Sequence, residues 1–172
     1  SNILVDQIIC SSYAKSINYK DNLSLGGYVS FIDIGFKKTS IISYFNDKII
    51  SLNIIRIGGN HITKDISQIL KIDLKESEQE KRNLSQNLKL LNNGDVLIDT
   101  LQKVIFARTE EILELCNNFI KSNSYTDDRF KVILTGEGSK IFNNQHKGKI
   151  PFLNDANFLE ETLEDICQSG FN

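Results

Sequence analysis

The sequence contains no methionine, no tryptophan and a single proline among its 172 residues, and it has only three cysteines and two histidines. The cysteines, Cys10, Cys116 and Cys167, are odd in number and far apart, and none has a partner at metal-ligand spacing. Reduced thiols are therefore expected, and neither a disulfide framework nor a zinc site is predicted. His61 and His146 are not close to any acid-rich loop in the sequence, so no catalytic triad is indicated.

Long apolar runs and an excess of positive charge are also missing. No stretch approaches the roughly 20 apolar residues that span a bilayer, and no charged-then-apolar leader opens the sequence. The formal net charge of -2 gives no general attraction for a phosphate backbone, so nucleic-acid binding is not expected. The absence of an initiator methionine before Ser1 favours an excised piece of a soluble intracellular protein.

The residues that are present supply one sizeable core, since 40% are hydrophobic and 24% charged over a length typical of one domain. Runs rich in Ile, Val and Phe predict strands at Tyr28–Ile34, Thr39–Phe45, Lys48–Ile57 and Phe130–Thr135. Tight turns join the first three strands, which predicts an antiparallel meander. Residue patterns predict helices at Tyr13–Leu23, His61–Leu70, Lys75–Leu88, Leu97–Lys121 and Asn157–Cys167. Ile3–Cys10 is expected to form a short strand or a helix end.

Asp33 and Gly35 stand out because an acidic residue and a glycine end a strand that otherwise has a buried pattern. A carboxylate beside unhindered backbone N–H groups can face a phosphate and its magnesium ion, and Lys37 and Lys38 would add positive charge. The alternative is a hairpin whose turn simply requires glycine and polar residues. Taken alone, this stretch favours the structural alternative.

Two further segments place polar groups in patterns suited to a nucleotide. Glu78, Lys81, Arg82 and Ser85 project from one face of a predicted helix, where they could bond ribose hydroxyls and cover a purine ring. A solvated face with favourable Glu-to-Lys pairs is the simpler interpretation. The strand that ends in "TGEGSK", residues 135–140, would let a flat ligand lie against backbone, although structural turns often produce Gly-x-Gly.

The order of these segments resembles the second half of an actin-like ATPase, the superfamily of actin, DnaK-type chaperones and bacterial filament proteins. "FIDIG" resembles its second phosphate loop, "ESEQEKRNLS" the adenosine-contacting helix of DnaK-type chaperones, and "LTGEGSK" its adenine loop. Within the superfamily, "GGNHITKDIS", "FARTEEILELC" and "DQIICSSYAKSI" are most similar to the FtsA family of bacterial cell-division proteins. The resemblance covers roughly residues 3–142.

The resemblance implies an α/β fold, the second lobe of an actin-like (ribonuclease H-like) ATPase, with a mixed sheet and packed helices. Residues 1–60 and 112–172 would form a lower subdomain, and residues 61–111 an inserted upper subdomain. The family implies ATP and Mg as cofactors, filament formation, and tethering of the C-terminal tail of FtsZ through the upper subdomain. It also implies other division proteins as partners and a cytoplasmic location at the inner face of the membrane at midcell. The acidic segment from Asn157 would be repelled by anionic lipid, so membrane contact is expected only through a segment missing here.

The resemblance also assigns roles to individual residues. Asp33 would face magnesium through phosphate or water. The other implied nucleotide contacts fall in three groups: the phosphate loop with Gly35, Lys38 and Thr39; the adenosine helix with Glu78, Lys81, Arg82 and Ser85; and the adenine loop with Gly136, Gly138, Ser139 and Lys140. No catalytic residue is assigned, and this piece alone is not expected to hydrolyse ATP, because phosphoryl transfer needs charge from both sides of the cleft.

The sequence departs from the family pattern at both glycine-rich loops. Phe36, Lys37 and Lys38 follow Gly35 where glycines and a threonine are usual, and Glu137 replaces a middle glycine. Three alternatives stay open: the actin-like component of a type IV pilus machine, half of a sugar or acetate kinase, and an interaction domain without a ligand. "ARTEEI" argues against the pilus protein, and the lost glycines argue against the kinase.

Overall fold

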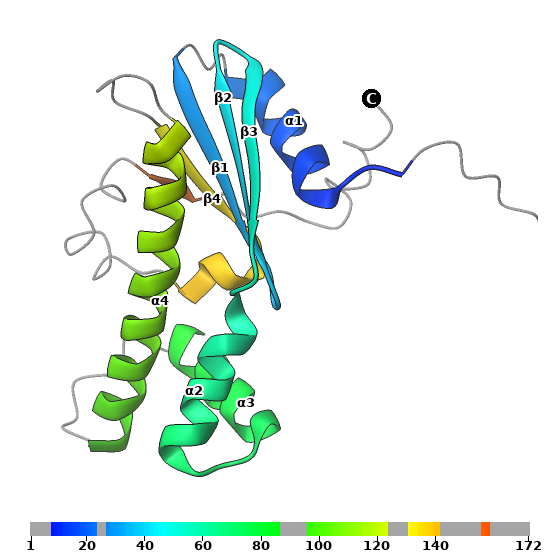
Figure 1. Cartoon of the computed structure of the whole chain (residues 1–172). Coiled ribbons are helices and arrows are strands. Elements are labelled where there is room, and N and C mark those ends of the chain that lie inside the picture. The colour runs from blue at the N-terminus through cyan, green and yellow to red at the C-terminus, as the bar shows by residue number, and fades with distance from the viewer. Residues whose placement is uncertain (1–7, 24–26, 87–95, 124–130, 142–155, 159–172) are drawn as a thin grey trace, which may run out of the picture.

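The computed structural model describes residues 8–23, 27–86, 96–123, 131–141 and 156–158 (Figure 1). The strands form one sheet in the order β3-β2-β1-β4-β5, with β1 at Tyr28–Ile34, β2 at Thr39–Phe45, β3 at Lys48–Ile55, β4 at Lys131–Thr135 and β5 at Asn157–Phe158. The helices are α1 (Ser11–Leu23), α2 (Gly59–Leu70), α3 (Leu74–Gln86), α4 (Val96–Asn123) and the short 3-10 helix η2 (Glu137–Ile141). Within the described residues, no helix is long and apolar enough to cross a membrane.

The sheet is mixed. Strands β1, β2 and β3 form the predicted antiparallel meander, whereas β4 runs parallel to β1 and β5 parallel to β4. Asn46 and Asp47 both have positive φ, 44° and 67°, which gives the tight turn between β2 and β3 a twist compatible with a hairpin. The register aligns Asp33 of β1 with Thr135 of β4, so the segments expected to form the phosphate loop and the adenine loop start at the same end of the sheet.

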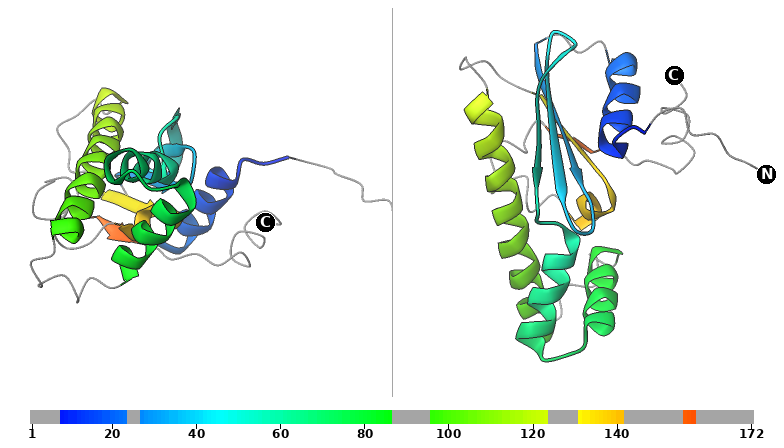
Figure 2. Two further views of the ribbon diagram at one scale, coloured as in Figure 1. Left: turned by 90° about the horizontal axis from the view of Figure 1, so that it is seen from below. Right: turned by 45° about the vertical axis from the view of Figure 1, so that its right-hand side comes forward.

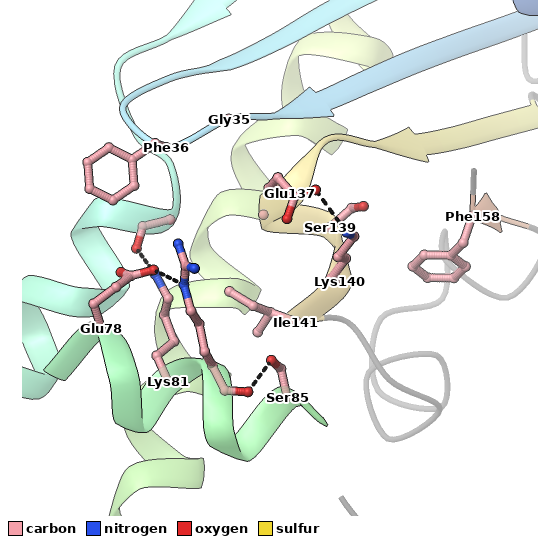
Figure 3. A pocket seen from close by; sticks show the side chains of 13 residues that line it. Gly35, Phe36, Glu78, Lys81, Ser85, Glu137, Ser139, Lys140, Ile141 and Phe158 are labelled. Atoms are coloured by element: carbon pink, nitrogen blue, oxygen red, sulfur yellow. Dashed lines mark hydrogen bonds and ion pairs between the residues drawn. The ribbon is translucent and has the colours of Figure 1, made fainter. Parts of the chain in front are cut away.

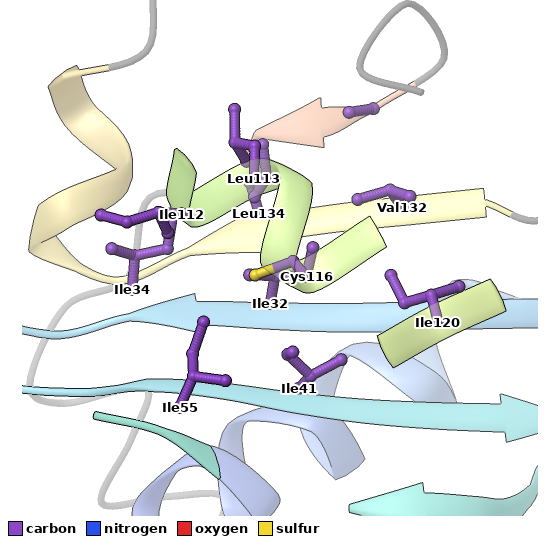
Figure 4. Packing of buried hydrophobic residues seen from close by; sticks show 11 residues of the cluster. Ile32, Ile34, Ile41, Ile55, Ile112, Leu113, Cys116, Ile120, Val132 and Leu134 are labelled. Carbon is purple, nitrogen blue, oxygen red and sulfur yellow. The ribbon is translucent and has the colours of Figure 1, made fainter. Parts of the chain in front are cut away.

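Helices cover both faces of the sheet, with α4 on one side and α1 on the other (Figure 2). Alternate residues of each strand therefore enter two cores. Ile32 and Ile34 of β1 pack against Ile112 and Leu113 of α4 (Figure 4), while Phe31 belongs to the cluster on the opposite face. Burial on both faces explains the continuous apolar run of β4, as predicted.

A third apolar cluster lies beyond the end of the sheet. Ile62 and Ile66 of α2 pack against Leu101 and Ile105, which belong to the N-terminal half of α4. Helix α4 is continuous across residues 111 and 112, so a single helix joins this cluster to the core of the sheet. Figure 1 shows α2 and α3 below the sheet, beside the lower half of α4.

Most of the predicted elements are confirmed, with ends that differ by a few residues. Strand β3 ends at Ile55 instead of Ile57. The prediction of a helix from Asn157 is wrong at its start, because residues 157–158 pair with β4 as β5, and the remainder lies outside the described residues. Residues 8–10 have no regular structure, and residues 3–7 lie outside the described residues.

Candidate nucleotide site

A pocket of about 650 Å³ opens where the β1–β2 hairpin, α2, α3 and η2 meet (Figure 3). Its wall combines glycine backbone, charged side chains of α3 and two aromatic rings; it is lined by Gly35, Phe36, Gly59, Glu78, Lys81, Arg82, Ser85, Glu137, Gly138, Ser139, Lys140, Ile141 and Phe158. The volume is in the range of about 300–1,000 Å³ that is usual for small-molecule sites. Residues from the hairpin, α2, α3, η2 and β5, which are far apart in the sequence, therefore share one cavity.

The N-terminus of α2 is held against the hairpin by its backbone. The N–H of Gly59 donates to the carbonyl of Gly35 at 3.0 Å, and the N–H of Asn60 donates to the carbonyl of Phe36 at 2.7 Å. Gly58 has extended backbone, with φ -163°, but a Cβ there would lie 2.4 Å from the Gly35 carbonyl oxygen. Only glycine therefore permits this approach between helix and hairpin.

Lys81 is the most buried charged group of the pocket wall, with 5% of its surface exposed. Its ammonium donates to the carbonyl of Gly59 at 3.1 Å, to the hydroxyl of Thr63 at 2.8 Å and to the carboxylate of Glu78 at 2.6 Å. Burial lowers the pKa of Lys81 more than its pairing with Glu78 raises it. The contacts with Gly59 and Thr63 fasten α3 to the first turns of α2.

Glu78 joins that cluster to the rim of the pocket. It accepts hydrogen bonds from Thr63 at 2.5 Å and from Arg82 at 2.9 Å, in addition to the one from Lys81. Burial alone would raise the pKa of Glu78, but the hydrogen bonds from Lys81, Thr63 and Arg82 outweigh it and hold the pKa below its ordinary value. Arg82 is 71% exposed, so its guanidinium is more accessible than the Lys81 ammonium, and Ser85 donates to the Arg82 carbonyl at 2.8 Å.

The loop after β4 is packed tightly against β1. A Cβ at Gly138 would lie 2.5 Å from Cγ2 of Ile34, and Gly136 has a positive φ of 87°, which a side chain would strain. Ser139 caps the turn by donating its hydroxyl to the Gly136 carbonyl at 2.7 Å. The side chain of Glu137 points outward, 83% exposed, and pairs with Lys140 at 2.8 Å.

The structure brings most of the predicted contact residues into the pocket wall but leaves four out of it. Lys38 is exposed, and neither Lys38 nor Gly136 lines the pocket. The hydroxyl of buried Thr39 donates to the Ile57 carbonyl at 2.8 Å. The carboxylate of Asp33 accepts hydrogen bonds from α1.

Sequence reasoning missed several wall residues. The sequence marks Phe36 and Glu137 only as departures from a family pattern, and Gly59 only as part of the segment "GGNHITKDIS". The Gly-Gly pair at the start of a helix was a usable signal for close backbone approach. Phe158 carries no local signal, because it reaches the wall only through the pairing of β5 with β4.

A family model described as "Cell division protein FtsA" matches residues 30–116, which include the hairpin, α2, α3 and most of α4. The chain belongs to the FtsA family. It is 35% identical over 132 residues to cell division protein FtsA of Bacillus subtilis (strain 168), a match that covers 68% of this chain and 30% of that protein. It is 30% identical over 192 residues to FtsA of Buchnera aphidicola subsp. Schizaphis graminum (strain Sg), covering 97% of this chain and 42% of that protein. The chain thus spans less than half the length of these FtsA relatives.

Solved structures place this FtsA-family chain among actin-like folds. MreB 5 of Spiroplasma citri bound to AMPPNP superposes with a TM-score of 0.69 at 15% identity, covering 94% of this chain and 56% of that one. The PilM-PilN type IV pilus biogenesis complex gives a TM-score of 0.63 at 17% identity, covering 95% of this chain and 44% of that one. Both likenesses concern the mixed α/β fold.

Proposed function

We propose that the chain is the nucleotide-binding lobe of an actin-like adaptor that polymerises and tethers FtsZ to the membrane at the division septum. Membership of the FtsA family is the observation that carries this proposal. It is supported by a pocket in which the phosphate-hairpin, adenosine-helix and adenine-loop segments meet. In the cell, the protein would work at the cytoplasmic face of the membrane at midcell.

The pocket is proposed as the ATP site. Arg82 would cover the purine with its stem, and Glu78 and Ser85 would contact the ribose. The backbone of Gly138, which lines the pocket, would lie under the base. Gly35 would approach the phosphates. Hydrolysis by this piece alone is not expected, because the groups that would act from the other side of a two-lobed cleft do not belong to it.

Residues 61–111 are proposed as the inserted upper subdomain that binds the FtsZ tail. A shallow groove between α2 and α4 offers a place for a short helical or extended peptide. Ile69, 51% exposed, supplies an apolar contact there. Arg108 supplies polar ones, with its guanidinium held by Asp65 at 2.6 Å and by Glu111. Hydrogen bonding to Asp65 raises the pKa of Arg108, so its charge is permanent.

Fluorescence polarisation with a labelled FtsZ C-terminal tail peptide tests the proposal. Peptides that dock in such grooves commonly bind near micromolar, about -8 kcal/mol, so saturation is measurable. Ile69→Lys should weaken binding at least tenfold. Leu74→Lys is the matched control, because Leu74 is equally exposed, 52%, but lies outside the groove. Equal affinity for both variants would reject the groove, and no binding by any folded variant would reject FtsZ tethering by this lobe.

A further inference from the structure

The carboxylate of Asp33 is already occupied by groups of this chain. Ser12 donates its hydroxyl to Oδ2 at 2.7 Å, and the ammonium of Lys15 donates to Oδ1 at 3.2 Å. Both donors come from α1, and the Lys15 and Asp33 side chains are only 12% and 14% exposed. The pair therefore fastens α1 to the end of the central strand β1, behind the hairpin.

These surroundings do not fit a magnesium ion. Mg²⁺ requires near-octahedral oxygen ligands at about 2.0–2.1 Å and usually keeps several waters, so it needs open space beside a carboxylate. On the loop side of Asp33 there is none, since even a Cβ at Gly136 would lie 2.4 Å from Oδ1. A cation at Lys15 would also repel a divalent ion. Among the described residues, no cluster of three or more His, Cys, Asp or Glu side chains offers another site.

We infer that the Lys15 ammonium takes the place of a divalent metal as the counter-ion of Asp33, so that ligand binding in the pocket is independent of magnesium. Lys15 is thus a residue that determines metal dependence. It does so without touching the ligand, because neither Lys15 nor Asp33 lines the pocket. The part of the inference that concerns ligand binding rests on the proposed nucleotide function.

Manganese(II), a paramagnetic stand-in for Mg²⁺, tests the metal site directly. In amide NMR spectra of the 172-residue chain, sub-millimolar Mn²⁺ should cause no selective broadening at residues 12, 33 and 136. Lys15→Met keeps an unbranched apolar stem but removes the ammonium, and should introduce selective broadening there. Lys15→Met combined with Asp33→Asn should remove this broadening again.

Lys103→Met, which breaks the exposed pair with Asp99, is the matched control, and its spectra should resemble those of the parent chain. Selective broadening near Asp33 in the parent chain overturns the inference, and so does a well-folded Lys15→Met chain without broadening. If that variant does not fold, Lys15→Gln takes its place under the same criteria.

Nucleotide affinity gives the second readout. A fluorescent ADP analogue should bind the parent chain with a dissociation constant that changes less than about twofold between excess Mg²⁺ and EDTA, whereas for Lys15→Met the change should reach tenfold or more. A tenfold weakening by EDTA in the parent chain overturns the inference. Absence of binding in both media rejects the proposed nucleotide function instead, and the Mn²⁺ spectra still decide the metal site.

Discussion

Replacing Gly58 by alanine should destabilise the chain through a steric clash that involves only backbone. The new Cβ would lie 2.4 Å from the Gly35 carbonyl oxygen and 2.9 Å from both the Lys38 nitrogen and the Phe36 oxygen, whereas ordinary contact begins near 3.4 Å. None of these three atoms is a flexible side-chain end, so α2 and the hairpin must separate by about 1 Å. Because the φ of Gly58 is -163°, backbone strain contributes nothing.

The cost follows from what that separation breaks. Overpacking costs roughly 1–3 kcal/mol, and losing the hydrogen bonds from Gly59 to Gly35 and from Asn60 to Phe36 adds about 1 kcal/mol each. The free energy of unfolding, measured by urea denaturation, should therefore fall by roughly 3–5 kcal/mol. Gly59→Ala is the matched control, because its Cβ would have ordinary contacts at 3.7 Å and 3.9 Å. Its stability should be unchanged or up to about 1 kcal/mol higher. Equal urea midpoints for the two variants would refute the explanation.

Three further outcomes follow from the burial of charged and thiol groups. Lys81→Met leaves Glu78 without its closest cation and should lower the free energy of unfolding by roughly 2–3 kcal/mol, whereas Lys103→Met, on an exposed pair, should stay within about 0.5 kcal/mol in the same urea assay. The pKa of Glu78 is depressed in the folded state, so the stability it contributes is complete above its ordinary pKa of 4.5 and is lost as the pH falls below it. Glu78→Gln should therefore make the free energy of unfolding depend less steeply on pH between pH 6 and pH 3. An unchanged pH dependence would contradict this. Burial raises the pKa of Cys116 to about 12, so peptide mapping after a thiol reagent at pH 8 should find label on exposed Cys10, and on Cys116 only in urea.

The regular elements were predictable from sequence because their signals are local. Short runs rich in Ile, Val and Phe mark β1 and β2, which are buried on both faces, and the apolar residues of α4 recur at helical spacing. The exception, β5, shows why local signals fail at a sheet edge. Asn157 and Phe158 form a strand only because β4 offers an unpaired edge at Ile133 and Leu134, and that pairing is set by tertiary structure.

The pocket was predictable in its segments but not in its partners. The helical pattern predicts the face on which Lys81 lies, but it does not specify which groups the Lys81 ammonium reaches. The partners Gly59 and Thr63 lie on α2, whose placement depends on the contact of Gly58 with the hairpin. Resemblance to a family predicts which type of residue stands at each position, whereas the hydrogen-bond partners of that residue depend on how separate elements pack.

Asp33 shows that difference most clearly. An acidic residue at the end of a buried strand needs a compensating charge or strong hydrogen bonds, because an unpaired carboxylate with little access to water is costly. A metal ion, a ligand or a side chain can each meet that need, and the sequence "FIDIG" is the same in all three cases. The choice is made elsewhere in the chain, by Ser12 and Lys15 one helical turn apart on α1. The spacing of these two residues therefore gives a better indication of metal dependence than the loop that contains the aspartate.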